Sequence, residues 1–206
     1  MSGRALVVDF GGVLTTNVFE SFRAFSEAEG LDPNAVKSIF RERGEGLDLL
    51  RQLERGELEI PEFERRFAPL LGVSESEGMV ERLFAGITAD EAMVDAVRAA
   101  KVAGVRTGLI SNSWGGTSYD RVRDPAELFD VMVISGEVGL HKPEPEIYRL
   151  AAERLGVAPS DCVFVDDLRE NCEGAEAVGM TAILHRGAER TLPELERLLG
   201  ITLATR

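Results

Sequence analysis

The first segment whose side chains could perform phosphate or metal chemistry is DFGGV (9–13). Asp9 follows two valines and precedes Gly11 and Gly12. A carboxylate in this position can act as a nucleophile, and its second oxygen can bind a cation. Glycines let the backbone approach a ligand closely and expose peptide N–H groups to phosphate oxygens. A lone aspartate here would be interpreted as the cap of a turn, and the two glycines favour the catalytic interpretation.

Two further segments offer groups that can hold a phosphate. Ser111 and Asn112 lie where an apolar run meets a turn, so their hydroxyl and amide can bind a phosphoryl group, although both are also common turn residues. Lys142 is more informative, because the chain has 3 lysines against 20 arginines. A compact ammonium can contact both a phosphate oxygen and a carboxylate nucleophile. The alternative is a solvated surface lysine, and neighbouring His141 is interpreted as a loop residue rather than a catalyst.

The fourth segment, VDDLREN (165–171), carries a pair of carboxylates. Successive strand residues point to opposite faces, so we expect only one of Asp166 and Asp167 to bind a metal directly. The other can orient Lys142 or a metal-bound water, and Asn171 can fasten the loop or support a metal ligand from behind. A helix-capping pair is the alternative. Carboxylate and carbonyl oxygens without a His or Cys cluster predict Mg²⁺ as the cofactor.

The elements that must position these groups follow from the apolar pattern. Five runs rich in β-branched residues predict buried strands, at 5–10, 105–111, 131–135, 162–166 and 180–185. Helical periodicity follows at 90–103, 144–155 and 169–178, with Asp90 and Pro145 as start signals. Repeated strand-then-helix order predicts an α/β fold with an open, doubly wound parallel sheet. Ligands of such sheets bind at the carboxyl ends of the strands, where the four segments lie.

Residues 16–88 have a different pattern, with Glu, Arg, Leu and Phe at three- and four-residue spacings. We interpret this stretch as a helical insertion, a cap, with helices at 18–30, 46–55 and 60–71. The core domain then comprises residues 1–15 and 89–206. Four aromatic residues could line the mouth between core and cap, although each is also an ordinary packing residue: Phe19, Phe22, Trp114 and Tyr119.

Composition limits the partners. The formal net charge of −13 argues against nucleic-acid binding, which depends on Lys and Arg contacts to phosphates. An acidic protein that binds phosphate must shield it locally, as a divalent cation would. No apolar run approaches the roughly 20 residues that span a bilayer, so we expect no membrane partner. No signal segment is apparent, and we expect a cytoplasmic protein in which Cys162, on a strand, and Cys172, on a helix, are free thiols.

In this order, the four segments resemble those of the haloacid dehalogenase superfamily. The subgroup with a DFGGV-like first segment is most similar, and it includes small sugar-phosphate phosphatases and the phosphatase domain of soluble epoxide hydrolases. ERGELEIPEF (54–63) and HKPEPEIY (141–148) are also similar to this subgroup. The resemblance implies a magnesium-dependent phosphatase that acts on a small phosphorylated metabolite. It makes Asp9 the nucleophile and a metal ligand. It assigns phosphate binding to Ser111, Asn112 and Lys142, and charge neutralisation to Lys142 as well. The other metal ligands would be Asp167, with Asp166 beside it, and the carbonyl of Gly11.

The sequence departs from the family at residue 11, where most of these phosphatases carry an aspartate that acts as general acid and base. Gly11 has no proton to give. General acid–base catalysis contributes about 10²–10⁴ in rate. The enzyme must recover this elsewhere or use substrates with good leaving groups, such as anomeric sugar, acyl or aryl phosphates, and we expect the latter. The alternative is a catalytically impaired relative that binds a phosphometabolite or regulates a partner.

Other chemistries on similar folds fit less well. A receiver-type signalling domain would place the acidic pair at the first strand, whereas here it comes last. Dehalogenation needs no metal, so the acidic pair would repel its carboxylate substrate. Phosphonate cleavage in the superfamily uses a cap lysine, and nothing around Lys37, the only lysine of the insertion, suggests activation. A phosphomutase would normally need the acid–base residue missing at position 11.

Overall fold

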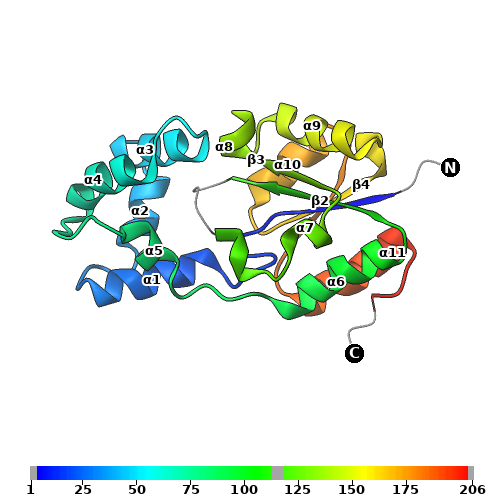
Figure 1. Ribbon diagram of the computed structural model, residues 1–206, viewed down its shortest axis with the longest axis horizontal. Coiled ribbons are helices and arrows are strands. Elements are labelled where there is room, and N and C mark those ends of the chain that lie inside the picture. The colour runs from blue at the N-terminus through cyan, green and yellow to red at the C-terminus, as the bar shows by residue number, and fades with distance from the viewer. Residues whose placement is uncertain (1–3, 113–117, 204–206) are drawn as a thin grey trace.

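A five-stranded parallel sheet forms the centre of the computed structural model, which describes residues 4–112 and 118–203 (Figure 1). Its strands are β1 (Ala5–Val8), β2 (Arg106–Ser111), β3 (Val131–Ile134), β4 (Cys162–Asp166) and β5 (Thr181–Leu184). They lie in the order β3-β2-β1-β4-β5, so β1 pairs with both β2 and β4. All five lie within the predicted runs, and the α/β class is confirmed. Because Val8 pairs with Leu109 and Val165, the three strands end close together.

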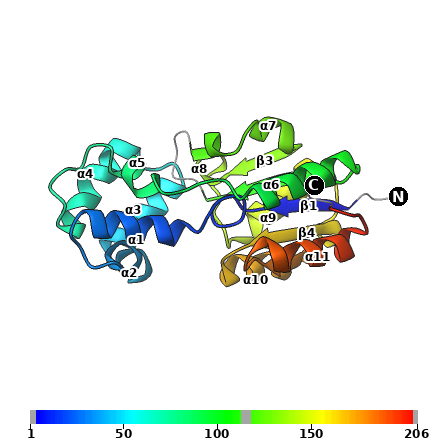
Figure 2. The same cartoon turned by 90° about the horizontal axis from the view of Figure 1, so that it is seen from below.

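Helices cover both faces of the sheet, because alternate strand residues point to opposite sides (Figure 2). Leu6 and Val8 belong to the hydrophobic cluster under α6 (Glu91–Val102) and α11 (Ala188–Leu199). Ala5 and Val7 belong to the cluster under α9 (Pro145–Leu155) and α10 (Arg169–Ala177). Short elements complete this part: η1 (Ser118–Arg121), α7 (Pro125–Leu128), α8 (Ser135–Val138) and η2 (Pro159–Asp161). The doubly wound arrangement is therefore as predicted.

The predicted start signals of two helices are confirmed. The Asp90 side chain caps α6 by accepting a hydrogen bond from the Met93 N–H at 3.1 Å. Pro145 is the first residue of α9, where its missing N–H costs no helical hydrogen bond. Cys162 and Cys172 are both buried and unpaired, as expected.

Five helices between β1 and α6 form a separate bundle, at the left of Figure 1: α1 (Val18–Ala28), α2 (Ala35–Arg41), α3 (Glu45–Glu54), α4 (Ile60–Leu71) and α5 (Met79–Phe84). The bundle has its own apolar core, in which the Phe67 ring stacks on Phe40 and Phe63 at centroid distances of 4.8 and 5.0 Å. We propose that this bundle is the cap of residues 16–88, and that residues 1–15 and 89–206 form the core domain.

Two chain segments connect the bundle to the sheet domain, and they are hydrogen-bonded to each other. Thr15 and Ala89 form an antiparallel bridge. The Thr16 N–H donates to the Thr88 carbonyl at 2.8 Å, and the Asp90 N–H donates to the Leu14 carbonyl at 2.9 Å. Both connections therefore pass from the sheet domain to the bundle at the same place. Within residues 4–112 and 118–203, no helix combines the length and apolarity needed to span a membrane.

Candidate active site

Asp9 is the first residue after β1, at the edge where β2 and β4 also end. Its N–H donates to the Val165 carbonyl at 2.9 Å, which continues the β1–β4 ladder by one residue and fixes the backbone. The residue is 8% exposed. Burial raises the pKa of Asp9 to about 7, against the opposing effect of the nearby Lys142 ammonium. A cation placed beside this carboxylate would favour its ionised form.

Lys142 bridges two of the predicted carboxylates. Its Nζ donates to Asp9 Oδ1 at 2.6 Å and to Asp166 Oδ2 at 2.7 Å, and its side chain is 1% exposed. Burial by itself would lower the pKa of this ammonium, but the charges of Asp166 and Asp9 outweigh burial and hold the pKa above its usual range. Lys142 is therefore a fixed positive charge beside Asp9, and the surface-lysine alternative is wrong.

Asp166 is completely buried and turns both carboxylate oxygens toward protein donors. Oδ2 accepts from Lys142, while Oδ1 accepts from the Leu168 N–H at 2.8 Å and from Asn171 Nδ2 at 3.0 Å. Tyr148 in turn donates its hydroxyl to the Asn171 carbonyl at 2.8 Å. Asn171 thus fastens the loop through Asp166, and Asp166 orients Lys142.

Asp167 is the carboxylate that remains for a metal. Oxygen atoms of Asp9, Asp166 and Asp167 lie within 4.8 Å of one another. Gly12 makes room for this arrangement: its φ is +75°, and a Cβ there would lie 2.7 Å from Asp167 Oδ2. Burial and the neighbouring Asp166 raise the pKa of Asp167 to about 6. Since oxygen donors around a compact cradle are what Mg²⁺ prefers, these residues fit such a cation.

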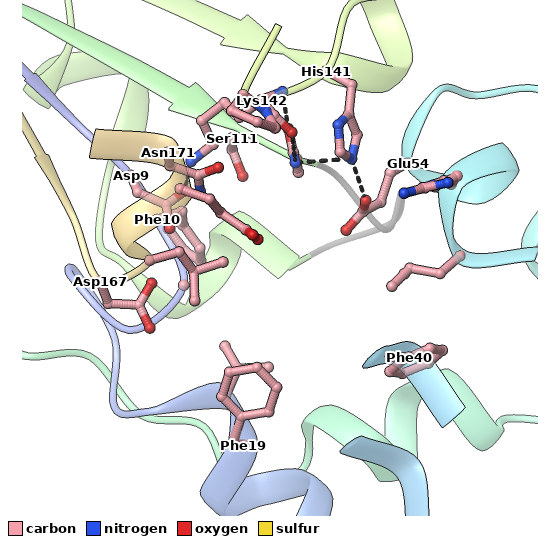
Figure 3. Close-up of a pocket in the computed structure, with 18 of the residues that line it drawn as sticks. Asp9, Phe10, Phe19, Phe40, Glu54, Ser111, His141, Lys142, Asp167 and Asn171 are labelled. Carbon is pink, nitrogen blue, oxygen red and sulfur yellow. Dashed lines mark hydrogen bonds and ion pairs between the residues drawn. The ribbon is translucent and has the colours of Figure 1, made fainter. Parts of the chain in front are cut away.

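Ser111 and Asn112 end β2 and line the same cavity as Asp9. Ser111 is buried, with its hydroxyl on the cavity side (Figure 3). The Asn112 amide is used within the protein: Oδ1 accepts from the Lys142 N–H at 2.9 Å, and Nδ2 donates to the Lys142 carbonyl at 3.1 Å. Its side chain therefore holds the Lys142 loop in place, a role that the turn-like Ser-Asn pair did not predict.

The cavity itself lies between the sheet domain and the cap and measures about 470 Å³. Its cap wall is mostly apolar and includes Phe19 and Phe22, and Tyr119 of the sheet domain also lines the cavity, as expected. Trp114, the fourth predicted aromatic, lies outside the described residues. Further apolar lining comes from residues that the sequence analysis did not single out: Val18, Phe40, Leu47, Leu50 and Phe84.

An outer cavity of about 720 Å³ shares part of this wall and opens beside Asp167. Four exposed arginines surround it, two from the cap and two from the sheet domain: Arg41, Arg51, Arg169 and Arg186. Asp167 and Glu170 are the acidic residues among its lining. The mouth of the site is thus locally basic in a chain of net charge −13.

Glu54 and His141 meet across the cavity from opposite domains (Figure 3). Glu54 ends α3 in the cap, and its Oε2 lies 2.6 Å from His141 Nε2. Both line the inner cavity, and their side chains are 12% and 17% exposed. His141 lies in a loop as expected, but its contact with Glu54 was not predicted. Both residues lie in segments that resemble the phosphatase subgroup, and this resemblance was the sequence feature that could have drawn attention to them.

The backbone around Glu54 docks on the sheet domain. The Ser135 hydroxyl donates to the Glu54 carbonyl, and Arg55 forms an ion pair with Glu144. Gly56 lies so close to Gly136 that a Cβ on Gly56 would be 2.5 Å from the Gly136 carbonyl oxygen. The end of α3 is therefore seated firmly at the edge of the site.

A family model for haloacid dehalogenase-like hydrolases matches residues 4–179 of the chain. The chain belongs to this family. In this haloacid dehalogenase-like hydrolase, Asp9, Ser111 and Asp166 lie at the ends of β1, β2 and β4, and Gly11 stands where the resemblance would place an aspartate. A Cβ on Gly11 would lie 3.0 Å from Val18 Cγ2 and would have no other neighbour within 4 Å among the described residues.

Curated relatives of this hydrolase differ in length and in name. Bifunctional epoxide hydrolase 2 of Sus scrofa is 28% identical over 222 residues, which cover 98% of this chain and 40% of the relative. The phosphorylated carbohydrates phosphatase of Thermotoga maritima is 29% identical over 189 residues, covering 87% and 83%. The chain spans between a fifth and two fifths of the first curated relatives that it matches nearly end to end.

Solved structures show the same fold. A haloacid dehalogenase family enzyme of Bacteroides thetaiotaomicron, in complex with magnesium and inorganic phosphate, matches with a TM-score of 0.68 and 20% identity. The match covers 89% of this chain and 94% of that enzyme.

Proposed function

We propose that this hydrolase is a magnesium-dependent phosphomonoesterase that forms an aspartyl-phosphate on Asp9. The observation that carries the proposal is the buried Lys142 ammonium, held 2.6 Å from Asp9 and 2.7 Å from Asp166, with Asp167 at the open side. A buried cation fixed beside a carboxylate suits a site where phosphate charge has to be neutralised.

Mg²⁺ would be held by the carboxylates of Asp9 and Asp167 and by the main-chain carbonyl of Gly11. When bound, it would neutralise phosphate charge and orient the phosphoryl group. The cradle at Gly12 and the oxygen donors support this site, as does the magnesium and phosphate complex of the Bacteroides enzyme. Asp166 is left out of the ligand set, because Lys142, Leu168 and Asn171 use its oxygens.

Catalysis by this chain would begin with attack of an Asp9 oxygen on phosphorus. A bond from Asp9 to phosphorus forms as the bond from phosphorus to the leaving oxygen breaks. Lys142 favours the ionised form of Asp9 and would balance the charge of the phosphoryl oxygens, which the Ser111 hydroxyl and the main chain at Asn112 would bind. Water then attacks phosphorus, which breaks the Asp9–phosphorus bond and releases inorganic phosphate.

The substrate would be a small phosphorylated metabolite with an apolar portion. Apolar side chains make up most of the cap wall of the inner cavity, where Arg41, Arg51 and Glu54 are the polar cap residues. The phenylalanine and leucine residues of this wall are Phe19, Phe22, Phe40, Leu47, Leu50 and Phe84. A curated relative of 27% identity over 154 residues is the sesquiterpene phosphatase astK of Aspergillus oryzae, which supports an apolar leaving group.

The test is a panel of phosphate esters assayed with and without Mg²⁺, on the wild type and on Asp9→Asn. We expect Mg²⁺-dependent release of phosphate that falls by at least about 10³-fold in Asp9→Asn. Asp95→Asn, an exposed partner of Arg98 on α6, is the control for loss of one carboxylate and should retain the activity. Turnover that survives in Asp9→Asn contradicts the proposed nucleophile.

Gly11 keeps a second candidate open, a relative that binds phosphometabolites without hydrolysing them. Beryllium fluoride, which mimics a phosphorylated aspartate, separates the two. Binding of esters by the wild type without any phosphate release, together with no beryllium fluoride complex on Asp9, would favour the binding protein.

A further inference from the structure

We propose that Glu54 of the cap is the general acid and base that Gly11 cannot supply, and that His141 positions it. This inference rests on the proposed phosphatase function. It replaces the expectation from the sequence that the enzyme manages without an acid, because the structure places a carboxyl group from another domain in the same cavity as Asp9.

The first step is the location of Glu54. Its side chain is 12% exposed and lines the inner cavity together with Asp9 and Ser111. It stands on the cap side of the cavity, where the leaving group would lie when the phosphoryl group of a bound substrate faces Asp9. Figure 3 shows its carboxylate directed into the cavity, toward His141.

The second step is the location of a proton between Glu54 and His141. The Asn112 amide has a fixed orientation, because Oδ1 accepts from the Lys142 N–H at 2.9 Å. Nδ2 therefore faces His141 Nε2, at 3.0 Å. Imidazole Nε2 has a single site in the ring plane, either a lone pair or a hydrogen, and Glu54 Oε2 is its nearer neighbour, at 2.6 Å. A contact this short needs a proton between the two atoms, so Glu54 and His141 share a proton that Glu54 can deliver to a group in the cavity.

The third step is the chemistry. In the first half-reaction, the Asp9–phosphorus bond forms, the bond to the leaving oxygen breaks, and that oxygen takes the proton of Glu54. The products are an alcohol, aspartyl-phosphate and a glutamate carboxylate. In the second half-reaction, this carboxylate takes a proton from the water that attacks phosphorus, so phosphate leaves and Glu54 regains its starting state. His141 contacts Glu54 rather than the reacting atoms, so it is a positioning residue.

The fourth step is the way in which the cap holds Glu54. The Ser135 hydroxyl binds the Glu54 carbonyl, and the Arg55–Glu144 ion pair flanks it. The acid therefore enters the site only when the end of α3 is docked on the sheet domain. Glu57, three residues after Glu54, is exposed and lines neither cavity, so it offers a matched control for loss of one glutamate.

The experiment compares Glu54→Gln with Glu57→Gln on 4-nitrophenyl phosphate and on an alkyl phosphate such as phenethyl phosphate. A nitrophenolate leaves without a proton, whereas an alkoxide needs one. We expect the alkyl-to-nitrophenyl ratio of kcat/KM to fall by about 10²–10⁴ in Glu54→Gln. The same ratio should stay at the wild-type value in Glu57→Gln. Equal ratios in the two variants, whatever the absolute rates, overturn the proposal.

The role of His141 is tested by the same ratio. His141→Ala leaves Glu54 without its partner, whereas His141→Gln keeps a polar group in reach. We expect the ratio to fall in His141→Ala and to recover in part in His141→Gln. If wild type hydrolyses 4-nitrophenyl phosphate through Asp9 but has a ratio as low as Glu54→Gln, the inference about Glu54 fails alone. If the wild type hydrolyses neither ester with Mg²⁺, the proposed function fails with it.

Discussion

Asp166 and Asp167 are adjacent in the chain, yet their carboxylates have different partners. Asp166 is completely buried, and Lys142 Nζ lies 2.7 Å from its Oδ2. Asp167 lines the cavity, in the space that the absence of a side chain at Gly12 leaves open. One carboxylate of the pair thus supports the protein framework, and the other is available to a ligand.

The two aspartates should therefore respond differently to the same substitution. Asp166→Asn removes the buried charge opposite Lys142, and breaking a buried pair costs about 3–5 kcal/mol of unfolding free energy. Asp167→Asn should leave the unfolding free energy within about 1 kcal/mol of wild type and raise the Mg²⁺ concentration for half-maximal activity by at least about tenfold. Denaturant unfolding and Mg²⁺ titration of each variant measure this. The reverse pattern would exchange the two roles.

The stabilisation of the protein by Mg²⁺ should grow with pH. The pKa values of about 7 for Asp9 and about 6 for Asp167 lie above the usual value, so the folded protein binds these protons more tightly than the unfolded chain. The resulting stability is fully present below about pH 4 and is lost as pH rises through 6 and 7. Mg²⁺ competes with those protons, so the increase in Tm on adding Mg²⁺ should rise from about pH 5 to about pH 8. An increase in Tm that is independent of pH in wild type, or that persists in Asp9→Asn/Asp167→Asn, contradicts this.

Gly12→Ala should weaken Mg²⁺ binding. The new Cβ would lie 2.7 Å from Asp167 Oδ2, in addition to the strain of a side chain at φ +75°. Gly30→Ala is the matched control, because φ is +71° there and nothing lies within 4 Å of the added Cβ. Both variants should lose about 1–2 kcal/mol of unfolding free energy from strain. Only Gly12→Ala should shift the Mg²⁺ titration, and equal titrations in the two variants would argue against Asp167 as a ligand.

Salt should slow the capture of substrate. The arginines around the outer cavity attract a phosphate to a protein that is otherwise acidic, and this attraction weakens as ionic strength rises. We expect kcat/KM to fall about two- to fivefold between about 0.05 and 0.3 M salt. Arg51→Gln should reduce that dependence, whereas Arg149→Gln, at an exposed position of α9, should not. Equal salt dependence in the two variants would show that the net charge of the protein, rather than the arginines around the outer cavity, determines the effect of salt.

Much of the sheet domain could be predicted from the sequence, because each strand is a short apolar run that ends at a polar residue. Asp9, Ser111 and Asp166 come together for a simple reason: the three parallel strands that carry them are neighbours and end in register. Helix α11 was not among the predicted elements, although Leu195 and Leu199 give it an apolar face. In the cap, α2 and α5 have 7 and 6 residues, too few for a clear periodic pattern.

Contacts between the cap and the sheet domain could not be predicted. Glu54 and His141 are 87 residues apart, and neither the strand pattern nor the helical pattern fixes how one domain docks on the other. The role of the Asn112 amide was missed for a related reason, because its partner, the Lys142 backbone, adopts its position only in the folded loop. Lys142 was predicted because its residue type is rare in this chain, a property that requires no tertiary structure.

The paired connections between Leu14 and Asp90 have a mechanical consequence. Because the Thr15–Ala89 bridge ties both crossings together, any movement of the cap would be a rotation about a single hinge line at this place. Asp9, Lys142 and Asp166 all lie on the stationary side of that hinge, whereas Glu54 and the apolar wall travel with the lid. Opening would then let the alcohol depart and water enter while Asp9 and Lys142 stay in place, and closing would return Glu54 to the site before that water attacks phosphorus.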